Sequence, residues 1–353
     1  MPWDAIPAMR LFEMRGKMMS AGVSQQQPQN PIRDDALRNQ LLARRNRLEA
    51  VLPQAPLAKF QELLGEIDAA LERMEAGTFG ICETCHDTIE NDRLLLDPLT
   101  RNCLDHLSPS ERRALERDLD LALEVQQGLL PPAELEIAGW TMAYCYRPVG
   151  PVSGDYCDVL PLEGGAGLFM LGDVSGKGVA ASMLMAQLHA IFRSLSLATA
   201  SVTELVGKAN RIFCQGNPTC HFATLVCGHL DGQGNVEMCN AGHCPPLWVS
   251  NGEVKHIEST GLPVGVLCDG EYPSHSRRLA RGDSLVLYTD GLSEAFNPAR
   301  ELYGAKRLRE LVARRAALSP NALLAAILQD LADFQAGHAR SDDLTIMVLR
   351  RTS

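Results

Sequence analysis

The chain has 353 residues, of which 46% are hydrophobic and 22% charged, a composition typical of a globular protein rather than of a disordered one. Its formal net charge of −10 argues against a general nucleic-acid-binding protein, which is usually basic, so no direct DNA binding is expected. No apolar run approaches the roughly 20 residues of a membrane-spanning helix, and the N-terminus lacks the apolar core of a signal peptide. The 11 cysteines are odd in number and partly lie in apolar runs, which favours reduced thiols in a cytoplasmic protein.

The chain is expected to begin with a disordered leader, which a helical hairpin follows. Residues 1–32 are polar and contain proline, and they show no periodicity. Residues 33–76 hold two helical patterns, which Pro53 and Pro56 separate and Gly77 ends. The hairpin is either a plain packing module or a module with a function of its own.

Two pairs of metal-binding side chains follow within residues 77–107. They are Cys82-x2-Cys85 and, after seventeen intervening residues, Cys103-x2-His106. Two close pairs at this separation are a strong zinc signature, because four nitrogen and sulfur ligands complete a tetrahedron. A closed set of four ligands leaves no open position, so we expect one structural Zn²⁺. His86 is a spare candidate, but its place next to Cys85 makes it a poor chelator.

The segment LERMEAGTFGICETCHDTIENDRLLLDPLTRNCLDH, with the hairpin before it, resembles the DksA/TraR zinc-finger family over about residues 35–107. The resemblance implies a small zinc finger; members of the family enter the secondary channel of RNA polymerase and act through acidic residues at the hairpin tip. Here the tip reads LPQAPLAK and carries no acid, and His106 replaces the usual last cysteine. A contact with RNA polymerase is therefore disfavoured, and a dimerisation or sensory module is expected.

A further helix is expected within residues 108–131. Ser108 as N-cap and Glu111 form a capping box, and Pro131 and Pro132 stop the helix. A coiled-coil spacing of 4, 3, 4 and 3 relates five residues, namely Leu115, Leu119, Ala122, Gln126 and Leu129. The pattern predicts either a homodimer through residues 108–130 or an amphipathic helix packed on its own chain.

Residues 132–353 are expected to form an α+β domain in which helices flank antiparallel sheets. Strand-like runs are WTMAYCYRP, GLFMLGD, FATLVCGHL, NVEMCNAG, SLVLYTD and LTIMVLRR, and two helical runs are VAASMLMAQLHAIFRSL and NALLAAILQDLADF. Several strands follow one another without an intervening helix, which favours antiparallel pairing.

Acidic residues stand at the ends of several of these strands. In LFMLGDVSGKG, Asp173 ends an apolar run before a glycine-rich turn, and Asp155 and Asp290 also stand beside glycines at strand ends. Asp342 and Asp343 open the last strand. Antiparallel strands can bring these ends together, and converging carboxylates without basic partners would repel one another. Divalent Mg²⁺ or Mn²⁺ would resolve the repulsion, because hard ions prefer oxygen ligands.

Six motifs resemble the metal-dependent protein phosphatase (PPM) family, in its bacterial sporulation and stress-response branch of SpoIIE/RsbU-like proteins. In chain order they are VSGDYCDV, GDVSGKGVAASMLMA, CNAGHCPPLWV, GLPVGV, LVLYTDGLSEAFN and DDLTIMVL. The resemblance spans about residues 118–351. It implies a PPM-type two-layer antiparallel β-sandwich flanked by helices, two catalytic Mn²⁺ or Mg²⁺ ions, and hydrolysis of phosphoserine or phosphothreonine on a protein.

The resemblance also implies roles for individual residues. Asp173 would bridge the two ions and Val174 would offer its carbonyl, Asp290 and Asp342 would bind the second ion with Asp343 as an alternative to Asp342, and Asp155 would complete the site around the water.

Other residues carry weaker signals. Lys177 is either a solvated turn lysine or a group that attracts phosphate, and Asn240 and His243 either shape a turn or act near the site. The residues after Asp173 supply no histidine as general acid. The chain contains neither a Cys-x5-Arg loop nor a GxxxxGK[ST] motif, so cysteine-phosphatase chemistry and ATP binding through a P-loop are not expected.

The leading hypothesis is a cytoplasmic protein serine/threonine phosphatase that its N-terminal zinc module regulates. By the resemblance, its substrate is a phosphorylated anti-sigma-factor antagonist. A catalytically inactive scaffold or transcriptional adaptor that acts through the zinc finger is the alternative, although all the expected acids are present. A phosphohydrolase of small molecules is a third hypothesis, because substrate choice lies in surface loops.

Overall fold

The computed structural model describes most of the chain after residue 30, and we confine the description to those parts. They are residues 31–51, 58–107, 109–162, 164–197, 199, 201–216, 221–250 and 252–353. Most of the predicted leader, the centre of the hairpin tip and the predicted N-cap Ser108 lie outside the described residues. The chain divides into two compact units, Met1–Arg113 and Ala114–Ser353.

The first unit holds two packed helices and a small cysteine-containing segment. Helices α2 (Pro31–Val51) and α3 (Ala58–Glu75) meet through the buried side chains of Leu41, Ile67 and Ala70. A short helix α4 (Asn91–Leu96) and the 3₁₀ turn η1 (Leu104–His106) follow. A second small core gathers five residues, namely Leu37, Cys82, Ile89, Leu94 and Cys103. Two of the predicted zinc ligands thus belong to the core of this unit.

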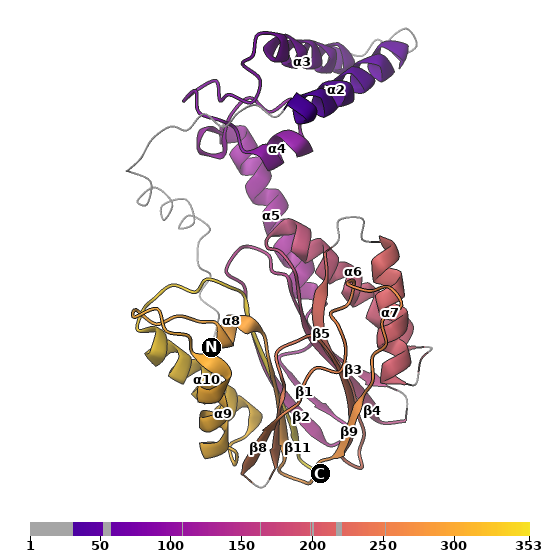
Figure 1. Ribbon diagram of the computed structural model, residues 1–353, viewed down its shortest axis with the longest axis vertical. Helices are drawn as coiled ribbons and strands as arrows, with labels where there is room; N and C mark the ends of the chain where they lie inside the picture. The colour runs from indigo at the N-terminus through magenta and orange to yellow at the C-terminus, as the bar shows by residue number, and fades with distance from the viewer. Residues whose placement is uncertain are drawn as a thin grey trace. The chain divides into compact units, whose positions relative to one another are not determined.

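The second unit is built on two antiparallel sheets (Figure 1). The six-stranded sheet has the order β1-β2-β11-β10-β7-β8, with β1 Glu134–Ile137, β2 Trp140–Arg147, β7 Leu247–Ser250, β8 Glu253–His256, β10 Ser284–Tyr288 and β11 Leu344–Arg351. The five-stranded sheet has the order β3-β4-β5-β6-β9, with β3 Asp155–Leu162, β4 Ala166–Val174, β5 Ala223–Leu230, β6 Asn235–Ala241 and β9 His275–Arg278.

Helices cover the outer face of each sheet (Figure 1). Helices α6 (Val179–Ser196) and α7 (Val202–Gly216) pack on the five-stranded sheet, whereas α9 (Gly304–Arg314) and α10 (Pro320–Gln335) pack on the other. Helix α5 (Pro109–Leu129) runs across the boundary between the units, and the short α8 (Asp290–Ser293) follows β10. The prediction of an α+β domain with antiparallel sheets flanked by helices is confirmed.

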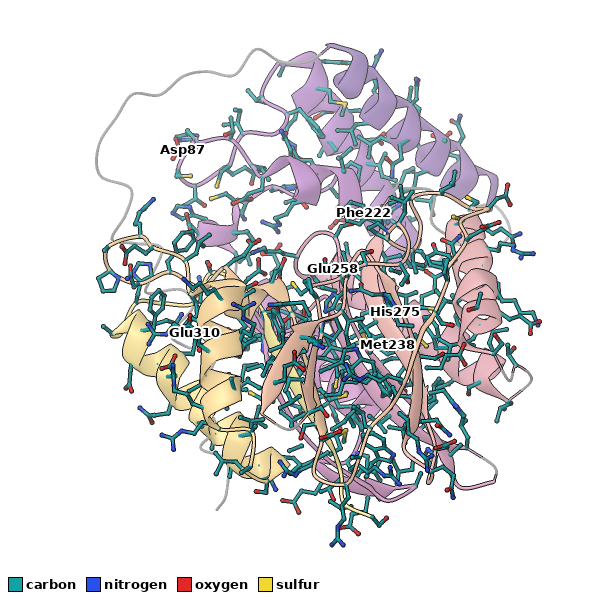
Figure 2. The ribbon with its side chains drawn as sticks, turned by 60° about the horizontal axis from the view of Figure 1, so that its bottom comes forward. Asp87, Phe222, Met238, Glu258, His275 and Glu310 are labelled. Atoms are coloured by element: carbon teal, nitrogen blue, oxygen red, sulfur yellow. The ribbon has the colours of Figure 1, made fainter. Side chains whose placement is uncertain are left out.

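Each central strand is buried on both faces, which explains its continuous apolar sequence. In β4, Phe169 and Leu171 enter the core between the sheets, whereas Leu168 and Met170 pack toward α6 and α7. The register places Phe169 opposite Gly228 of β5, where a Cβ atom would overlap the phenyl ring. At the sheet edge, Met238 of β6 lies beside His275 of β9 (Figure 2).

The expectation of two helical runs was incomplete, because α7 and α9 are also present. Helix α7 begins with β-branched residues and contains Gly207, all of which have low helix propensity. Its helical signal is the apolar face of Val206, Ala209 and Phe213, which is buried against the sheet. Helix α9 is rich in arginine and buries only Leu308, Leu311 and Val312.

Among the described residues, no helix combines the length and the apolar character required to cross a bilayer.

Replacing Phe169 with alanine is expected to lower the free energy of unfolding of the second unit by about 3–5 kcal/mol, because the lost ring leaves a cavity. Trp140 and Trp248 lie in this unit, so tryptophan fluorescence during urea unfolding measures the change. As a control, Leu197→Ala alters a side chain that is 88% exposed and should change stability by less than about 0.5 kcal/mol. Equal effects of the two substitutions would contradict the placement of Phe169 between the sheets.

Candidate active site

Four of the predicted acids meet at one end of the sandwich. Asp155, the first residue of β3, lies directly opposite Asp173 near the end of β4. Asp290 follows β10, and Asp342 precedes β11, which pairs with β10. The register of the two antiparallel pairs thus brings together acids that lie far apart in the sequence, from Asp155 to Asp342.

Three of these acids line one pocket of about 410 Å³. Its lining residues are Asp173, Ser175, Gly176, Lys177, Phe222, Thr224, Gly242, His243, Cys244, Asp290, Glu294 and Asp342. Asp155 and Asp343 are absent from this lining. The pocket wall is therefore acidic, with a single lysine among the described residues that form it.

Asp155 joins the two sheets. Its side chain belongs to the five-stranded sheet, and only 1% of the residue is exposed. The Thr289 hydroxyl donates a hydrogen bond of 3.1 Å to Asp155 Oδ2, and the Thr345 hydroxyl donates to the same oxygen. Both threonines belong to the six-stranded side, next to Asp290 and at the start of β11. A buried carboxylate with two hydroxyl donors thus fixes the ends of the sheets to each other.

The acids raise one another's pKa values. Burial first, and then the charges of Asp290, Asp342 and Asp343, raise the pKa of Asp173 to about 7. Burial and the neighbouring Asp173 raise the pKa of Asp155 well above its ordinary value. Burial and Asp342 likewise raise the pKa of Asp290. The pocket accordingly disfavours its own negative charges and would favour a bound cation.

Asp342 and Asp343 have different surroundings. Asp342 lines the pocket, and its Oδ2 lies 2.9 Å from Lys177 Nζ. Asp343 instead accepts hydrogen bonds from the backbone N–H groups of Val149, at 2.7 Å, and of Gly154, at 3.3 Å. Asp343 therefore holds the loop before β3, whereas Asp342 is free to contribute to the pocket.

The residues present fit a pair of hard divalent ions. A Cβ atom on Gly154 would lie 2.9 Å from the Val174 carbonyl oxygen and 3.3 Å from Asp173 Oδ1, so glycine keeps these two oxygens accessible. All the groups here that could bind a metal ion would do so through oxygen atoms, which suits Mg²⁺ or Mn²⁺. Among the described residues, no three acidic side chains bring their ligand atoms within 4.8 Å of one another, so the acids are spread along the pocket.

The weaker sequence signals have definite places. Lys177 is an exposed turn lysine, and its Nζ also forms an ion pair with Asp342 at 2.9 Å. Asn240 shapes a turn, because its Oδ1 accepts from the His243 N–H at 2.8 Å. His243 Nδ1 lies 2.8 Å from the Thr224 hydroxyl, and burial lowers the pKa of His243 to about 4. A neutral, buried His243 supports the pocket wall.

Helix α5 reaches the loop that carries Asp155. Gln126 Nε2 donates to the Ser153 carbonyl at 2.8 Å, and Gln126 Oε1 accepts from the Ser153 N–H at 3.0 Å. Leu129 packs on the core of the five-stranded sheet and its helices. Gln126 and Leu129 pack on their own chain, as the alternative of an amphipathic helix expects. Leu115, by contrast, remains 41% exposed.

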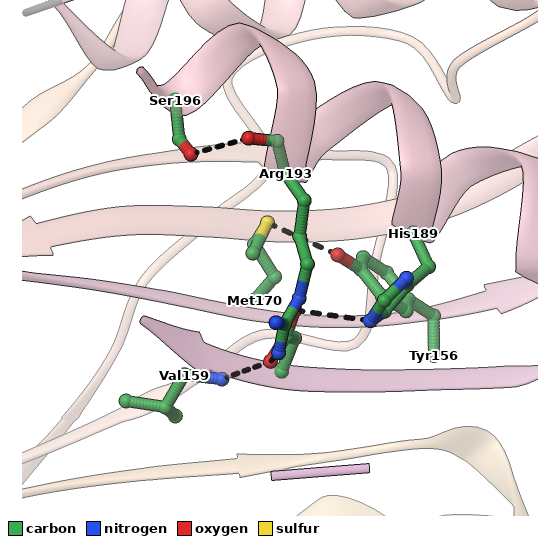
Figure 3. A network of polar contacts seen from close by, with 7 residues as sticks. Tyr156, Val159, Met170, His189, Arg193 and Ser196 are labelled. Atoms are coloured by element: carbon green, nitrogen blue, oxygen red, sulfur yellow. Dashed lines mark hydrogen bonds and ion pairs between the residues drawn. The ribbon is translucent and has the colours of Figure 1, made fainter. Parts of the chain in front are cut away.

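An ion pair between the half-exposed Arg193 and the buried Asp158 links α6 to β3 (Figure 3). Arg193 donates two hydrogen bonds to the Asp158 carboxylate, at 2.9 and 3.0 Å, and the Val159 N–H donates a third at 2.8 Å. His189 Nε2 lies 3.5 Å from the same carboxylate. Because Asp158 is fully buried, the removal of Arg193 would leave an uncompensated charge. The pair therefore holds α6 in place on the strand that begins with Asp155.

The first unit contains a tight group of potential metal ligands. The ligand atoms of Cys82, Cys85, Cys103 and His106 all lie within 4.8 Å of one another. Cys85 Sγ is 3.8 Å from Cys103 Sγ, which matches the edge of about 3.8 Å in a tetrahedron with Zn–S bonds of about 2.3 Å. Burial alone would raise the pKa of Cys82, but backbone hydrogen bonds lower it to about 6, whereas burial and the neighbouring thiols raise the pKa of Cys103 to about 11. His86 has no place in this group.

Sequence reasoning missed three residues that organise the site, namely Gln126, Thr289 and Thr345. Each left a weak signal. Thr289 directly precedes Asp290, Thr345 lies two positions after Asp343, and Gln126 interrupts an apolar helical face. A polar residue within an apolar pattern often marks a buried hydrogen bond, but the pattern alone does not identify its partner.

Comparison with known proteins identifies a family for the second unit. Residues 163–352 match the family model described as Stage II sporulation protein E (SpoIIE), and this range is more than half of the 353-residue chain. The chain is 27% identical over 263 residues to Protein IcfG of Synechocystis, an alignment that covers 66% of this chain and 41% of IcfG. It is 24% identical over 246 residues to phosphoserine phosphatase RsbU of Bacillus subtilis, covering 68% of this chain and 72% of RsbU.

A solved structure has the same fold. The crystal structure of the RsbU and RsbW domains of a Mycobacterium tuberculosis protein is 30% identical to this chain, with a TM-score of 0.55. The match covers 62% of this chain and 62% of that one. The chain thus spans less than two thirds of IcfG and of the mycobacterial protein.

The pKa of Asp173 predicts how metal-free stability depends on pH. The folded carboxyl has a pKa of about 7, whereas the unfolded value is about 3.9, so the folded state retains a proton that the unfolded chain loses between these values. Stability should therefore fall as the pH rises from about 4 to 7. Asp173→Asn removes this penalty and should stabilise the EDTA-treated protein by about 1–3 kcal/mol at pH 8, and by much less near pH 5.

Urea unfolding of both proteins at the two pH values measures the difference. Glu310→Gln, which alters an exposed side chain on α9 (Figure 2), serves as the control and should leave the pH dependence unchanged. An Asp173→Asn protein no more stable than the parent at pH 8 would contradict the proposed charge repulsion.

Proposed function

This chain belongs to the SpoIIE family, and from that membership and the geometry of the site we propose that it is a metal-dependent protein serine/threonine phosphatase. The observation that carries the proposal is the convergence of Asp173, Asp290 and Asp342 on one pocket at the end of the sandwich. The relatives support it, because RsbU is a phosphoserine phosphatase. A protein with this many acids in one pocket would repel a phosphate ester unless cations were bound there.

The residues of the pocket divide the work between ion binding and positioning. Asp173, Asp290 and Asp342, with the Val174 carbonyl, would hold two Mn²⁺ or Mg²⁺ ions. Such ions neutralise the phosphoryl oxygens and lower the pKa of the attacking water. Asp155 keeps the ends of β3 and β4 in place through its hydrogen bonds to the threonines of the other sheet. Gly154 leaves room for the oxygens of Asp173 and Val174.

Among the described residues that line the pocket, no side chain is a good general acid. His243 is the histidine among the described residues that line the pocket, but it is buried and its pKa is about 4, so it is neutral at physiological pH. Lys177 also lines the pocket, but its hydrogen bond to Asp342 raises its pKa, so it keeps its proton. Water, rather than a side chain, would therefore protonate the leaving serine or threonine oxygen.

For the substrate we propose a phosphorylated anti-sigma-factor antagonist. Two relatives support a phosphoprotein as the substrate. RsbU is a phosphoserine phosphatase, and the mycobacterial protein carries an RsbU domain and an RsbW domain in one chain. The exposed Phe222, which is 40% accessible, lies at the pocket wall where the surface of a protein substrate would pass.

For the first unit we propose a DksA/TraR-like zinc finger with a structural Zn²⁺ on Cys82, Cys85, Cys103 and His106. Two of these cysteines belong to a small core, so loss of the metal would loosen the packing around Leu37, Ile89 and Leu94. Helix α5 begins at the end of this unit and ends where Gln126 binds the Ser153 backbone. The helix therefore offers a route by which the zinc module regulates the phosphatase site, either within one chain or in a homodimer.

Hydrolysis of an aryl phosphate by the full chain tests the activity. Turnover should require Mn²⁺ or Mg²⁺ and stop with EDTA, and Asp290→Asn should reduce it by at least about 100-fold, because one ligand of the proposed site loses its charge. Glu310→Gln on the exposed surface of α9 should retain full activity. Metal-independent turnover, or an Asp290→Asn protein as active as the parent, would exclude this mechanism.

The zinc content of the purified chain tests the first unit. One equivalent of Zn²⁺ per chain is expected by elemental analysis, and Cys82→Ser should reduce it at least tenfold and lower the melting temperature of this unit. Cys268→Ser, which alters an exposed cysteine of the second unit, is the matched control and should leave the zinc content unchanged. A metal-free parent protein purified without chelators would overturn the assignment.

A further inference from the structure

Lys177 contacts one of the carboxylates that are proposed to bind a divalent ion. Its Nζ lies 2.9 Å from Asp342 Oδ2 and 2.9 Å from the Ser341 carbonyl oxygen. Asp342 is one of the carboxylates assigned above to the metal site. In the structure, the ammonium group thus satisfies part of the charge that a bound metal would otherwise satisfy.

The lysine is also the one Lys or Arg among the described residues that line the pocket. Four carboxylates share this wall, from Asp173, Asp290, Glu294 and Asp342. A phosphate ester that enters the pocket brings further negative charge and accepts strong charge-assisted hydrogen bonds from an ammonium group. No other fixed cation of the described lining could provide such a bond.

The backbone around Lys177 allows its side chain to change partners. The residue stands in the turn between β4 and α6, with glycines on both sides that have positive φ angles of 105° and 75°. Its side chain is 65% exposed, so no packing holds the four-carbon stem in one conformation. The ammonium group can therefore leave Asp342 without disturbing the core.

We propose that Lys177 is an exchangeable cation, which occupies Asp342 in the absence of metal, gives way to the divalent ion, and then binds the phosphoryl oxygens of the substrate. This inference rests on the proposed phosphatase function and adds a phosphate-binding residue to it. The ion pair with Asp342 makes Lys177 a competitor of the metal. Once displaced, the same charge lies beside the pocket into which the phosphate enters.

Two measurements on Lys177→Met test the exchange, because methionine keeps an apolar stem and removes the charge. Titration of the EDTA-treated full chain with Mn²⁺ should show a dissociation constant at least about fivefold lower than that of the parent, because the competitor is gone. With Mn²⁺ bound, inorganic phosphate should bind at least about tenfold more weakly, and KM for an aryl phosphate should rise by a similar factor. Lys177→Arg should restore phosphate binding, since it restores the charge.

Lys255→Met is the matched control. Lys255 forms an exposed ion pair with Glu253, at 3.2 Å, on a strand away from the pocket lining, and its loss should change neither constant. A merely structural role of Lys177 would weaken metal and phosphate binding together, and that outcome would overturn the proposal, as would unchanged constants. The two binding titrations need no turnover. A parent chain that binds Mn²⁺ and phosphate but hydrolyses nothing would therefore contradict the proposed function and leave the exchange measurable.

Discussion

The buried carboxylate of Asp155 is the interaction on which the candidate site depends. It is the point at which the two sheets are joined by hydrogen bonds at the acidic end of the sandwich, through Thr289 and Thr345. Asp173 pairs with Asp155 on one sheet, and Asp290 and Asp342 adjoin the two threonines on the other. If this connection were lost, the core between the sheets would still hold them together, but the acids would no longer be held in register across the pocket.

Such an arrangement stores electrostatic repulsion that bound cations would relieve. Burial and mutual proximity raise the pKa values of three aspartates, so the metal-free pocket is unfavourable at neutral pH. The protein keeps the acids in place by surrounding them with neutral support: backbone N–H groups hold Asp343, hydroxyls hold Asp155, and a neutral His243 supports Thr224. Free energy of folding is thus given up to keep these acids assembled at the pocket that is proposed to bind ions.

The sequence predicted the candidate site best where residues with metal-binding side chains stand in a recognisable local pattern. Asp173, followed by a glycine-rich turn at the end of an apolar run, and the Cys-x2-Cys and Cys-x2-His pairs were recognisable because the spacing of the residues itself brings the ligands close. The strands that carry the acids were predicted from continuous apolar runs. Helices α7 and α9 were missed because Gly207 and the arginines of α9 obscure their apolar faces. The partners of Gln126 and Thr345 depend on tertiary contacts across 27 and 190 positions, which no local pattern encodes.

The contact of Gln126 with Ser153 has a consequence for how this protein can vary. Both hydrogen bonds reach main-chain atoms, so the connection between α5 and the loop does not depend on which side chain stands at position 153. The amide is uncharged, so neither salt nor moderate changes of pH should weaken it. A substitution at position 153 that keeps the backbone N–H retains both hydrogen bonds, whereas loss of the Gln126 amide removes both of them.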